Sequence, residues 1–243
     1  MDLYRKIGFY EKYIKRLLDI SCSLGAIVCF SWLFILVGIA VRIKLGSPII
    51  FKQPRPGIVN EQTGREQIFM MYKFRTMTDE RDAAGKLLPD DVRLASFGAW
   101  LRSTSLDEIP ELFNILNGSM SLIGPRPQLV RDMVFMSEEQ RMRHTARPGL
   151  SGLAQVNGRN AISWEEKLQF DLQYIKDVSF YSDVKIILKT VGKAFIKREG
   201  ITEGDMATAE DYGDYLLRKG LINKDYYDNK QTEAIKILEE NQK

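Results

Sequence analysis

The sequence predicts a mainly helical α/β fold with a small antiparallel sheet or hairpin, an N-terminal re-entrant membrane helix and amphipathic helices in the membrane interface. Three observations lead to this prediction. Residues 20–41 form an apolar run of 22 residues without a charge. Residues 48–76 combine prolines with strand-like alternation, whereas later segments have helical spacing. The length of 243 residues allows one globular domain of about 200 residues beside the apolar run.

The apolar run is long enough to cross a membrane, because a helix of that length reaches ~33 Å at ~1.5 Å per residue. Its flanks argue for a return instead, since Lys and Arg prefer the cytoplasmic side and a re-entrant helix keeps both flanks there. The basic flanking residues are Arg5, Lys6, Lys12, Lys15 and Arg16 before the run and Arg42, Lys44, Lys52 and Arg55 after it.

Residues 48–76 are expected to form the hairpin. Its first part, FKQPRPG (51–57), favours short extended pieces and turns because of its prolines. QIFMMYKFRTM (67–77) is typical of a strand, and the two-residue period of a strand places Lys73 and Arg75 on one face.

Helices are expected next. VRLASFGAWLRSTS (92–105) has helical spacing. Ser105 and Glu108 match the S-x-x-E pattern of a capping box, which predicts a second, short helix that stops at Gly118.

Two later segments have the composition of ligand-binding loops, the proline-rich 124–130 and the glycine- and asparagine-rich 147–164. Residues 165–177 are expected to be helical. Residues 183–198 predict a basic amphipathic helix that either covers the core or lies in the membrane interface. The tail after residue 200 is polar and ends in a predicted helix. The lysines of the amphipathic helix are Lys185, Lys189, Lys193 and Lys197.

Composition disfavours several function classes. The single histidine, His144, gives little support to a Ser-His-Asp triad or a multi-histidine metal site. Cys22 and Cys29 lie inside the apolar run, where packing or lipid contact is expected rather than a disulfide. The tail after residue 200 has ten acidic and six basic residues, so the first 200 residues carry about +7. That excess suits phosphate ligands or an anionic membrane surface, and no nucleic-acid-binding pattern is present.

The adjacent carboxylates Asp107 and Glu108 are the sharpest candidate for chemistry. They are expected near a helix N-terminus, whose partial positive charge favours the ionised form, and Pro110 fits the first turn of that helix. An ionised aspartate can attack phosphorus or bind Mg²⁺, and a neighbouring glutamate can share the metal or move protons. The alternative is that Glu108 only caps the helix and Asp107 only suits its dipole.

Five basic residues favour the chemical interpretation. A guanidinium group matches phosphate oxygens, and prolines on both sides of Arg126 fix the backbone that presents it. Each residue alone would suit a surface ion pair. Together they indicate a site for a phosphorylated substrate, in which the carboxylates hold a metal that offsets phosphate repulsion. The five are Lys73, Arg75, Arg102, Arg126 and Arg159.

Several motifs occur in order over residues 12–200: KRLLDI, FKQPRPG, YKFRTM, RSTSLDEIPELFNIL, GSMSLIGPRPQLV, RPGLSGLAQVNGRNAISW and FDLQYIKD. Together they resemble the bacterial sugar transferases, which are polyprenyl-phosphate hexose-1-phosphate transferases or small monotopic phosphoglycosyl transferases. The most similar branch contains the bacillosamine-phosphate transferases of N-glycosylation and relatives that prime exopolysaccharide and capsule synthesis. The family's membrane helix commonly bends at a Ser-Pro pair, which Ser31-Trp32 replaces here. The resemblance therefore implies a bend at Ser31-Trp32, which without proline relies on the Ser31 hydroxyl bonding to a preceding carbonyl, with help from Gly25 and Gly38. The extension after about residue 215 has no recognised counterpart.

The resemblance implies a two-step reaction. Asp107 attacks the β-phosphate of a UDP-sugar, which gives a covalent phosphosugar intermediate and releases UMP. A polyprenyl phosphate, usually undecaprenyl phosphate, then takes the sugar phosphate. Glu108 is the second member of the catalytic pair, and Mg²⁺ bridges the pair and the diphosphate. The implied substrate-binding residues are Lys73, Arg75, Arg102, Pro125, Arg126, Pro127, Gln155, Asn157, Arg159, Asn160 and Asp171, the last as an acidic residue near the metal.

The resemblance also implies a cellular location. Residues 1–45 would form a basic N-terminus and re-entrant helix in the bacterial inner (cytoplasmic) membrane. Residues 46–200 would form the catalytic domain on the cytoplasmic face, and residues 201–243 a polar C-terminal extension.

The expected partners are a UDP-sugar, undecaprenyl phosphate and the phospholipid membrane, without nucleic acid. The enzyme would perform the first membrane step of N-glycan, capsule, exopolysaccharide or O-antigen synthesis. The identity of the sugar and a homodimer stay open. The alternative is a non-catalytic, basic, membrane-attached phospholipid-binding or scaffold protein, which would leave the acidic pair unexplained.

Overall fold

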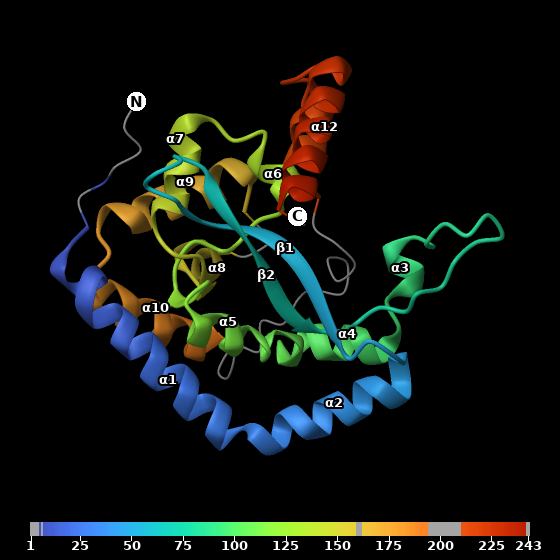
Figure 1. The fold of residues 1–243 in the computed structure, drawn as a ribbon, viewed down its shortest axis with the longest axis horizontal. Helices are drawn as coiled ribbons and strands as arrows, with labels where there is room; N and C mark the ends of the chain where they lie inside the picture. The colour runs from blue at the N-terminus through green and yellow to red at the C-terminus, as the bar shows by residue number, and fades with distance from the viewer. Residues whose placement is uncertain (1–4, 6, 159–161, 194–209, 242–243) are drawn as a thin grey trace.

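The computed structural model describes residues 5, 7–158, 162–193 and 210–241. These residues form the predicted mainly helical fold with small sheets (Figure 1). The strands are β1 (Ile50–Val59), β2 (Glu66–Phe74), β3 (Ser121–Ile123) and β4 (Gly149–Ser151). The helices are α1 (Lys15–Cys29), α2 (Ser31–Leu45), α3 (Asp90–Arg93), α4 (Ser96–Ser103), α5 (Glu111–Asn117), α6 (Val130–Met133), α7 (Glu138–Arg141), α8 (Leu153–Asn157), α9 (Trp164–Lys176), α10 (Phe180–Val191), α11 (Tyr212–Arg218) and α12 (Lys224–Glu240). Further helical turns span Tyr10–Ile14, Leu106–Glu108 and Met142–Thr145.

The N-terminal helices α1 and α2 meet at an angle of 65° (Figure 1). The break lies at Phe30, one residue before the predicted Ser31-Trp32. The Ser31 hydroxyl donates to the carbonyl oxygen three residues earlier at 3.0 Å, which is the predicted bond to a preceding carbonyl. Gly25 and Gly38 lie inside the two helices, so the break itself contains no glycine.

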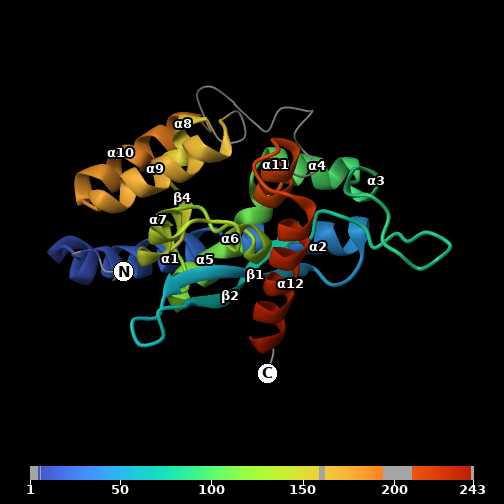
Figure 2. The ribbon, with the colours of Figure 1, turned by 90° about the horizontal axis from the view of Figure 1, so that it is seen from above.

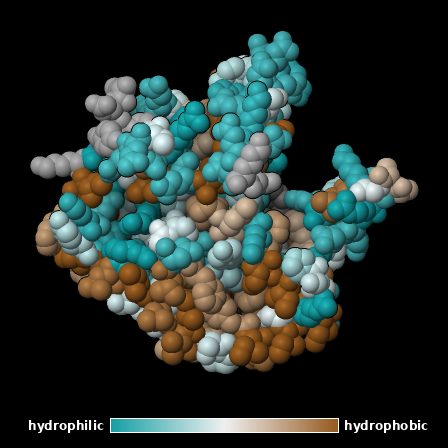
Figure 3. Space-filling view, viewed as in Figure 1, coloured by the Kyte–Doolittle hydropathy of each residue, from teal (hydrophilic) through white to brown (hydrophobic). Residues whose placement is uncertain are grey.

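Helix α1 is inverted relative to a helix that packs on a core, whereas α2 buries the apolar Val37, Val41 and Leu45. Within α1 the buried residues are the polar Lys15, Asp19 and Ser23. Apolar side chains face outward instead and form a continuous band along the lower face of the molecule in Figure 3. No single helix among the described residues is long and apolar enough to span a membrane, and α1 and α2 reach that criterion only as a bent pair. The exposed apolar residues are Leu17, Leu24, Val28, Trp32, Ile35, Leu36, Ile39 and Ile43.

Polar residues of the KRLLDI motif join α1 to the rest of the protein. Lys15 forms a buried ion pair with Asp183 of α10. Arg16 donates to two main-chain carbonyl oxygens at the C-terminal end of α5. Asp19 accepts a hydrogen bond from the Ser121 hydroxyl of β3 at 3.0 Å. These contacts fix the apolar helices relative to the elements that carry the candidate site.

The predicted hairpin is confirmed: β1 and β2 are antiparallel and pair Ile50 with Phe74. Pro54 and Pro56 lie within β1. Because they are two residues apart and have no N–H group, both nitrogens face the open edge of the sheet. Figure 2 shows the hairpin on one side of the molecule and α8, α9 and α10 on the opposite side, with α5 between them.

A second strand pair, β3 with β4, is parallel. Strand β4 and helix α8 both lie in the segment 147–164, so the prediction that this segment is a loop is wrong for these residues. Ser121 of β3 lies opposite Gly149 of β4. A Cβ atom on Gly149 would lie 2.1 Å from the Gly124 nitrogen, so the two chains can approach only because residue 149 lacks a side chain. Strands of three residues are too short to show alternation in a sequence, which is why this pair was not predicted.

The later helices largely follow the prediction. The helix expected over 165–177 is α9, the helix expected over 183–198 begins earlier as α10, and the helix at the end of the tail is α12. The last predicted residues of the amphipathic helix lie outside the described residues. Helix α10 buries Ile186 in the core and exposes a row of apolar side chains, so it both covers the core and presents an apolar surface. The exposed apolar residues of α10 are Phe180, Tyr181, Ile187, Leu188 and Val191.

Candidate active site

The acidic pair Asp107-Glu108 lies on the 3₁₀ turn between α4 and α5. The capping box predicted at Ser105 is wrong, because the Ser105 side chain makes no cap bond and its backbone has φ 55°. Among the described residues it is the one non-glycine residue with a positive φ. A left-handed serine costs about 1–2 kcal/mol, and this strained residue lies two positions before Asp107. The helix end predicted at Gly118 is confirmed by its left-handed φ of 93°.

Helix α4 is fixed against the end of β2. The predicted helix 92–105 is divided into α3 and α4. A Cβ atom on Gly98 of α4 would lie 1.8 Å from the Thr76 carbonyl oxygen, so only glycine allows this contact. One turn later, Arg102 Nε donates to the Thr76 hydroxyl at 3.0 Å. These contacts place Arg102 close to the acidic pair: burial lowers the pKa of Arg102, while the charge of Asp107 opposes that shift.

Glu108 is held by two cations from distant parts of the chain. Its Oε1 accepts a hydrogen bond from Lys73 Nζ at 2.8 Å and another from Arg126 Nη2 at 2.7 Å. Burial alone would raise the pKa of the Glu108 carboxyl, but the charges of Arg126 and Lys73 outweigh it and hold the pKa far below its ordinary value. Glu108 is therefore an ionised carboxylate that joins β2 to the turn after β3.

Asp107 is the reactive candidate of the pair. It is 7% exposed, and no hydrogen bond or ion pair holds its carboxylate within the part of the chain that the structure describes. Burial raises the pKa of Asp107 to about 6, and the charge of Glu108 adds to the shift. Three nearby cations oppose it: Lys73, Arg102 and Arg126. The helix dipole was expected to favour the ionised form of Asp107, but burial and the neighbouring carboxylate dominate and raise its pKa.

Glu111 is a third carboxylate that the sequence interpretation missed. It is 1% exposed, and its Oε1 lies 3.2 Å from Lys73 Nζ. Burial raises the pKa of Glu111 to about 7, against the opposing charge of Lys73. Its position three residues after Glu108, across Pro110, was a usable signal because that spacing returns a side chain to the same side of a helical turn.

The turn Pro125-Arg126-Pro127 presents Arg126 to Glu108, and two other arginines hold its backbone. Arg143 Nη2 donates to the Arg126 carbonyl oxygen at 2.5 Å. Arg55 Nη1 donates to the Pro127 carbonyl oxygen at 3.2 Å. The prolines restrict φ, and the two arginines fix the carbonyl groups, so the Arg126 side chain is presented from a rigid turn.

Asp171 lies in a buried ion pair and not at the acidic pair. Arg143 donates to Asp171 Oδ2 from Nε at 2.9 Å and from Nη2 at 2.7 Å, and both side chains are at most 2% exposed. Asp171 is thus the counterion of the arginine that holds the Arg126 backbone, and its expected position near the metal stays a prediction.

A histidine extends this buried network. His144 Nδ1 lies 3.1 Å from Glu66 Oε1, and His144 Nε2 lies 3.2 Å from Arg143 Nη1. Burial lowers the pKa of His144 to about 4, so the ring is neutral, with Nδ1 donating to Glu66 and Nε2 accepting from Arg143. No pattern in the sequence indicated that the single histidine contacts and orients Arg143.

The other predicted substrate-binding residues are less well supported. Arg75 lies beyond the end of β2, donates to the Met77 carbonyl oxygen at 2.7 Å and pairs with Asp79 at 2.8 Å, so the face predicted to be shared with Lys73 does not bring it to the acidic pair. On α8, Gln155 and Asn157 donate to main-chain carbonyl groups of their own segment. Their role in substrate binding stays a prediction. Arg159 and Asn160 lie outside the described residues.

The site's donor set fits magnesium. Within the described residues no group of three His, Cys, Asp or Glu side chains could hold a metal by itself. Magnesium, however, is usually bound by one or two carboxylates together with substrate phosphates and water. Asp107, whose carboxylate is unengaged, and its neighbour Glu108 would supply two such ligands, and magnesium binding here stays a prediction.

Comparison with known proteins shows which family the chain belongs to. The family model described as bacterial sugar transferase matches residues 10–197. The chain is 45% identical over 199 residues to the uncharacterized sugar transferase EpsL of Bacillus subtilis, a match that covers 82% of this chain and 95% of that protein. It is 36% identical over 194 residues to the UDP-glucose:undecaprenyl-phosphate glucose-1-phosphate transferase of Klebsiella pneumoniae, covering 76% of this chain and 40% of the relative.

A third relative is the undecaprenyl-phosphate galactose phosphotransferase of Salmonella typhimurium, 32% identical over 207 residues, which are 78% of this chain and 42% of the relative. The chain thus spans nearly the whole Bacillus protein and less than half of the two larger relatives. The matched region contains the acidic pair Asp107-Glu108 and the two cations that contact Glu108, which are Lys73 and the proline-flanked Arg126. The chain belongs to the bacterial sugar transferase family.

Proposed function

We propose that the protein transfers a sugar 1-phosphate from a UDP-sugar to undecaprenyl phosphate or a similar polyprenyl phosphate. The observation that carries the proposal is the unengaged carboxylate of Asp107, which lies beside an ionised Glu108 and among three cations. The names of the Klebsiella and Salmonella relatives, which refer to undecaprenyl phosphate, support the choice of acceptor.

In the first step, an Asp107 oxygen forms a bond to the β-phosphorus of the UDP-sugar. The bond from that phosphorus to the oxygen bridging the two phosphates breaks, and UMP leaves with the electron pair. In the second step, a phosphate oxygen of the polyprenyl phosphate attacks the same phosphorus. The acyl-phosphate bond to Asp107 breaks, which restores the carboxylate and yields the polyprenyl diphosphate sugar.

The chain's cations suit the charge that these steps create. Arg126 and Lys73 hold Glu108 ionised and in place, and their remaining N–H groups can contact phosphate oxygens. Arg102, fixed by its bond to Thr76, supplies a further positive charge. Bound Mg²⁺, held by Asp107 and Glu108, would supply charge that offsets repulsion between the carboxylates and the diphosphate.

The apolar surface supports action at a membrane. We infer that the bent pair α1–α2 is re-entrant and that α10 lies in the interface of the cytoplasmic leaflet, because basic residues flank the apolar run on both sides. The polar contacts of Lys15, Arg16 and Asp19 would then hold the catalytic domain against the surface from which a polyprenyl phosphate is presented.

The test is UMP release from a panel of UDP-sugars by the protein in membranes that contain undecaprenyl phosphate and Mg²⁺. The panel contains UDP-glucose, UDP-galactose, UDP-GlcNAc, UDP-GalNAc and the UDP-linked N-acetylated bacillosamine. We expect UMP from at least one of them and a matching polyprenyl diphosphate sugar. No UMP from the whole panel would contradict the proposal and favour the non-catalytic scaffold.

A further inference from the structure

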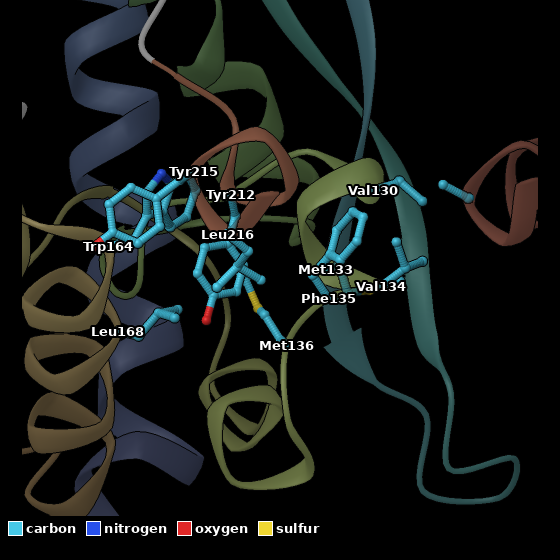
Figure 4. Packing of buried hydrophobic residues seen from close by; sticks show 11 residues of the cluster. Val130, Met133, Val134, Phe135, Met136, Trp164, Leu168, Tyr212, Tyr215 and Leu216 are labelled. Carbon is cyan, nitrogen blue, oxygen red and sulfur yellow. The ribbon is translucent and has the colours of Figure 1, made fainter. Parts of the chain in front are cut away.

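The C-terminal segment 210–241 completes the core on one side of the molecule. Three side chains of α11 and one of α12 belong to a buried cluster with α6 and α9 (Figure 4). The Tyr212 ring lies 5.0 Å from the Trp164 ring of α9, measured between centroids. A Cβ atom on Gly213 would lie 2.4 Å from the Phe135 ring, so α11 packs closely against the residues that follow α6. The four contributed residues are Tyr212, Tyr215, Leu216 and Ala234.

Two adjacent residues of α6 bind two adjacent residues at the start of α11. Asp132 Oδ1 accepts a hydrogen bond from the Tyr212 main-chain N–H at 2.9 Å. Its other oxygen, Oδ2, accepts from the Leu129 N–H at 3.1 Å, which closes the first turn of α6. Arg131 forms an ion pair with Asp211 at 2.6 Å. Asp132 is 2% exposed, so no water replaces a bond that it loses.

Helix α6 begins three residues after the turn Pro125–Pro127, and the same carboxylate acts on that turn from a second direction. Arg55, which donates to the Pro127 carbonyl oxygen, is partly buried. Burial lowers the pKa of Arg55 to about 10 and Arg126 adds to that shift, while the charge of Asp132 opposes it. Asp132 thus stabilises both the helix that follows the turn and the arginine that holds it.

We propose that the C-terminal segment 210–241 is a positioning element of the active site, which holds the Arg126 turn against Glu108 through the contact of the Tyr212 N–H with Asp132. The proposal rests on the proposed sugar-phosphate transfer for its catalytic consequence only. Tyr212 and Asp132 touch no reacting group and act through the turn. The segment would therefore be a required part of the catalytic domain, although the family match ends at residue 197.

A pair of substitutions at one residue separates the N–H bond from the packing of the ring. Tyr212→Ala removes the ring and keeps the N–H group, whereas Tyr212→Pro removes both. Proline is accommodated here because Tyr212 is the first residue of α11, and the preceding Asp211 has φ −68° and ψ 154°, the conformation that a residue before proline prefers. The two variants therefore differ chiefly in the bond to Asp132.

The first measurement is hydrogen exchange of the amides in residues 126–133, which does not depend on turnover. We expect exchange there to be ~10-fold faster in Tyr212→Pro than in Tyr212→Ala, because one buried hydrogen bond is lost. Equal exchange in the two variants would overturn the proposal whether or not the protein is active.

The second measurement is UMP release by the same variants. We expect kcat to be ~10-fold lower in Tyr212→Pro than in Tyr212→Ala, with an unchanged KM for the UDP-sugar, because a displaced turn slows chemistry. Equal kcat values would overturn the catalytic consequence, whereas an inactive wild-type chain would contradict the proposed transfer and leave the exchange result to decide the link.

Two further variants keep the test decisive if Tyr212→Pro does not fold. Asp132→Asn retains the shape of the side chain but cannot accept both N–H groups, so faster exchange and lower kcat are expected. The matched control is Tyr215→Phe, which removes the bond of α11 to Glu165 of α9 at 2.7 Å and leaves α6 untouched. Equal effects of Asp132→Asn and Tyr215→Phe on residues 126–133 would show that the segment only stabilises the fold and would overturn the proposal.

Discussion

Arg143 is shared between Asp171 and the backbone of the candidate site: its Nη2 lies 2.7 Å from Asp171 Oδ2 and 2.5 Å from the Arg126 carbonyl oxygen. A carboxylate expected beside a metal is thus the counterion of an arginine that holds the proline-flanked turn. Asp171 Oδ1 has no hydrogen-bond partner and is fully buried, so the pair depends on Oδ2 alone. This relationship assigns Asp171 to the support of Arg126.

Asp171→Asn is expected to lower stability without changing the Mg²⁺ requirement. The substitution leaves the Arg143 guanidinium buried without its counterion, which costs on the order of 3 kcal/mol. Urea unfolding measures the loss, and a Mg²⁺ titration of the remaining UMP release gives the metal dependence. A control is Asp79→Asn, which removes a mostly exposed partner of Arg75 and should cost less than about 1 kcal/mol. A large rise in the Mg²⁺ concentration for half-maximal activity of Asp171→Asn would return this residue to the metal.

His144→Gln is expected to reduce the loss of stability on acidification. Burial lowers the pKa of His144 from 6.5 to about 4, so between these values the unfolded chain binds a proton that the folded chain does not. The contribution of His144 to wild-type stability should therefore fall by about 2 kcal/mol from pH 7 to pH 5. The variant lacks this loss, and the raised pKa values of Asp107 and Glu111 affect both proteins alike, so the difference between the two proteins should change by about 2 kcal/mol. The bonds from His144 and Arg141 lower the pKa of Glu66 to about 2 against the effect of burial, so its contribution is lost only at lower pH. Urea midpoints at pH 7 and pH 5 measure the difference, and identical slopes for the two proteins would contradict the neutral, buried state of His144.

Local chemistry predicted the parts of the fold that depend on neighbouring residues. The hairpin follows from alternation, the end of α5 from Gly118, and the bend between α1 and α2 from Ser31. The left-handed Ser105 and the three-residue strands β3 and β4 could not be predicted, because tertiary contacts impose them on segments without a strong preference. For this reason the capping box assigned to Ser105 is wrong, while the same pattern at Ser163 forms the capping box of α9.

The site was predictable in its residue types and not in its connections. The acidic pair, Lys73 and Arg126 were identified from the sequence, and the structure brings them together. The role of Asp171 depends on which side chains meet across the core, which spacing along the chain does not encode, whereas the spacing of Glu111 from Glu108 was a signal that the sequence interpretation did not use.

Glu108→Gln and Glu111→Gln are expected to differ sharply in their effect on UMP release, although each removes a carboxylate that pairs with Lys73. Glu108→Gln should lower UMP release by at least ~100-fold, because Lys73 and Arg126 lose the carboxylate that orients them. Glu111→Gln should change it by less than about threefold, because Lys73 keeps its bond to Glu108. Steady-state UMP release at saturating UDP-sugar compares the two. A loss in Glu111→Gln equal to that in Glu108→Gln would make Glu111 a third catalytic carboxylate.

A cysteine at residue 3 is expected to react only from the cytoplasmic side. After Cys22 and Cys29 are replaced by alanine, Leu3→Cys should resist a membrane-impermeant maleimide in intact cells and react once the cells are permeabilised. Gln53→Cys, within the second basic flank, is the control and should behave identically. Reaction of Leu3→Cys alone from outside would show that residues 20–41 span the membrane and would contradict the re-entrant arrangement.

The central claim is that Asp107 carries the sugar phosphate during the reaction. Mass spectrometry of protein that is mixed with its UDP-sugar and quenched in acid, without polyprenyl phosphate, tests it most directly. We expect one added sugar phosphate on the peptide containing Asp107, a matching amount of UMP, and neither product from Asp107→Asn. Asp107→Asn that still releases UMP, or an adduct on another residue, would contradict the account.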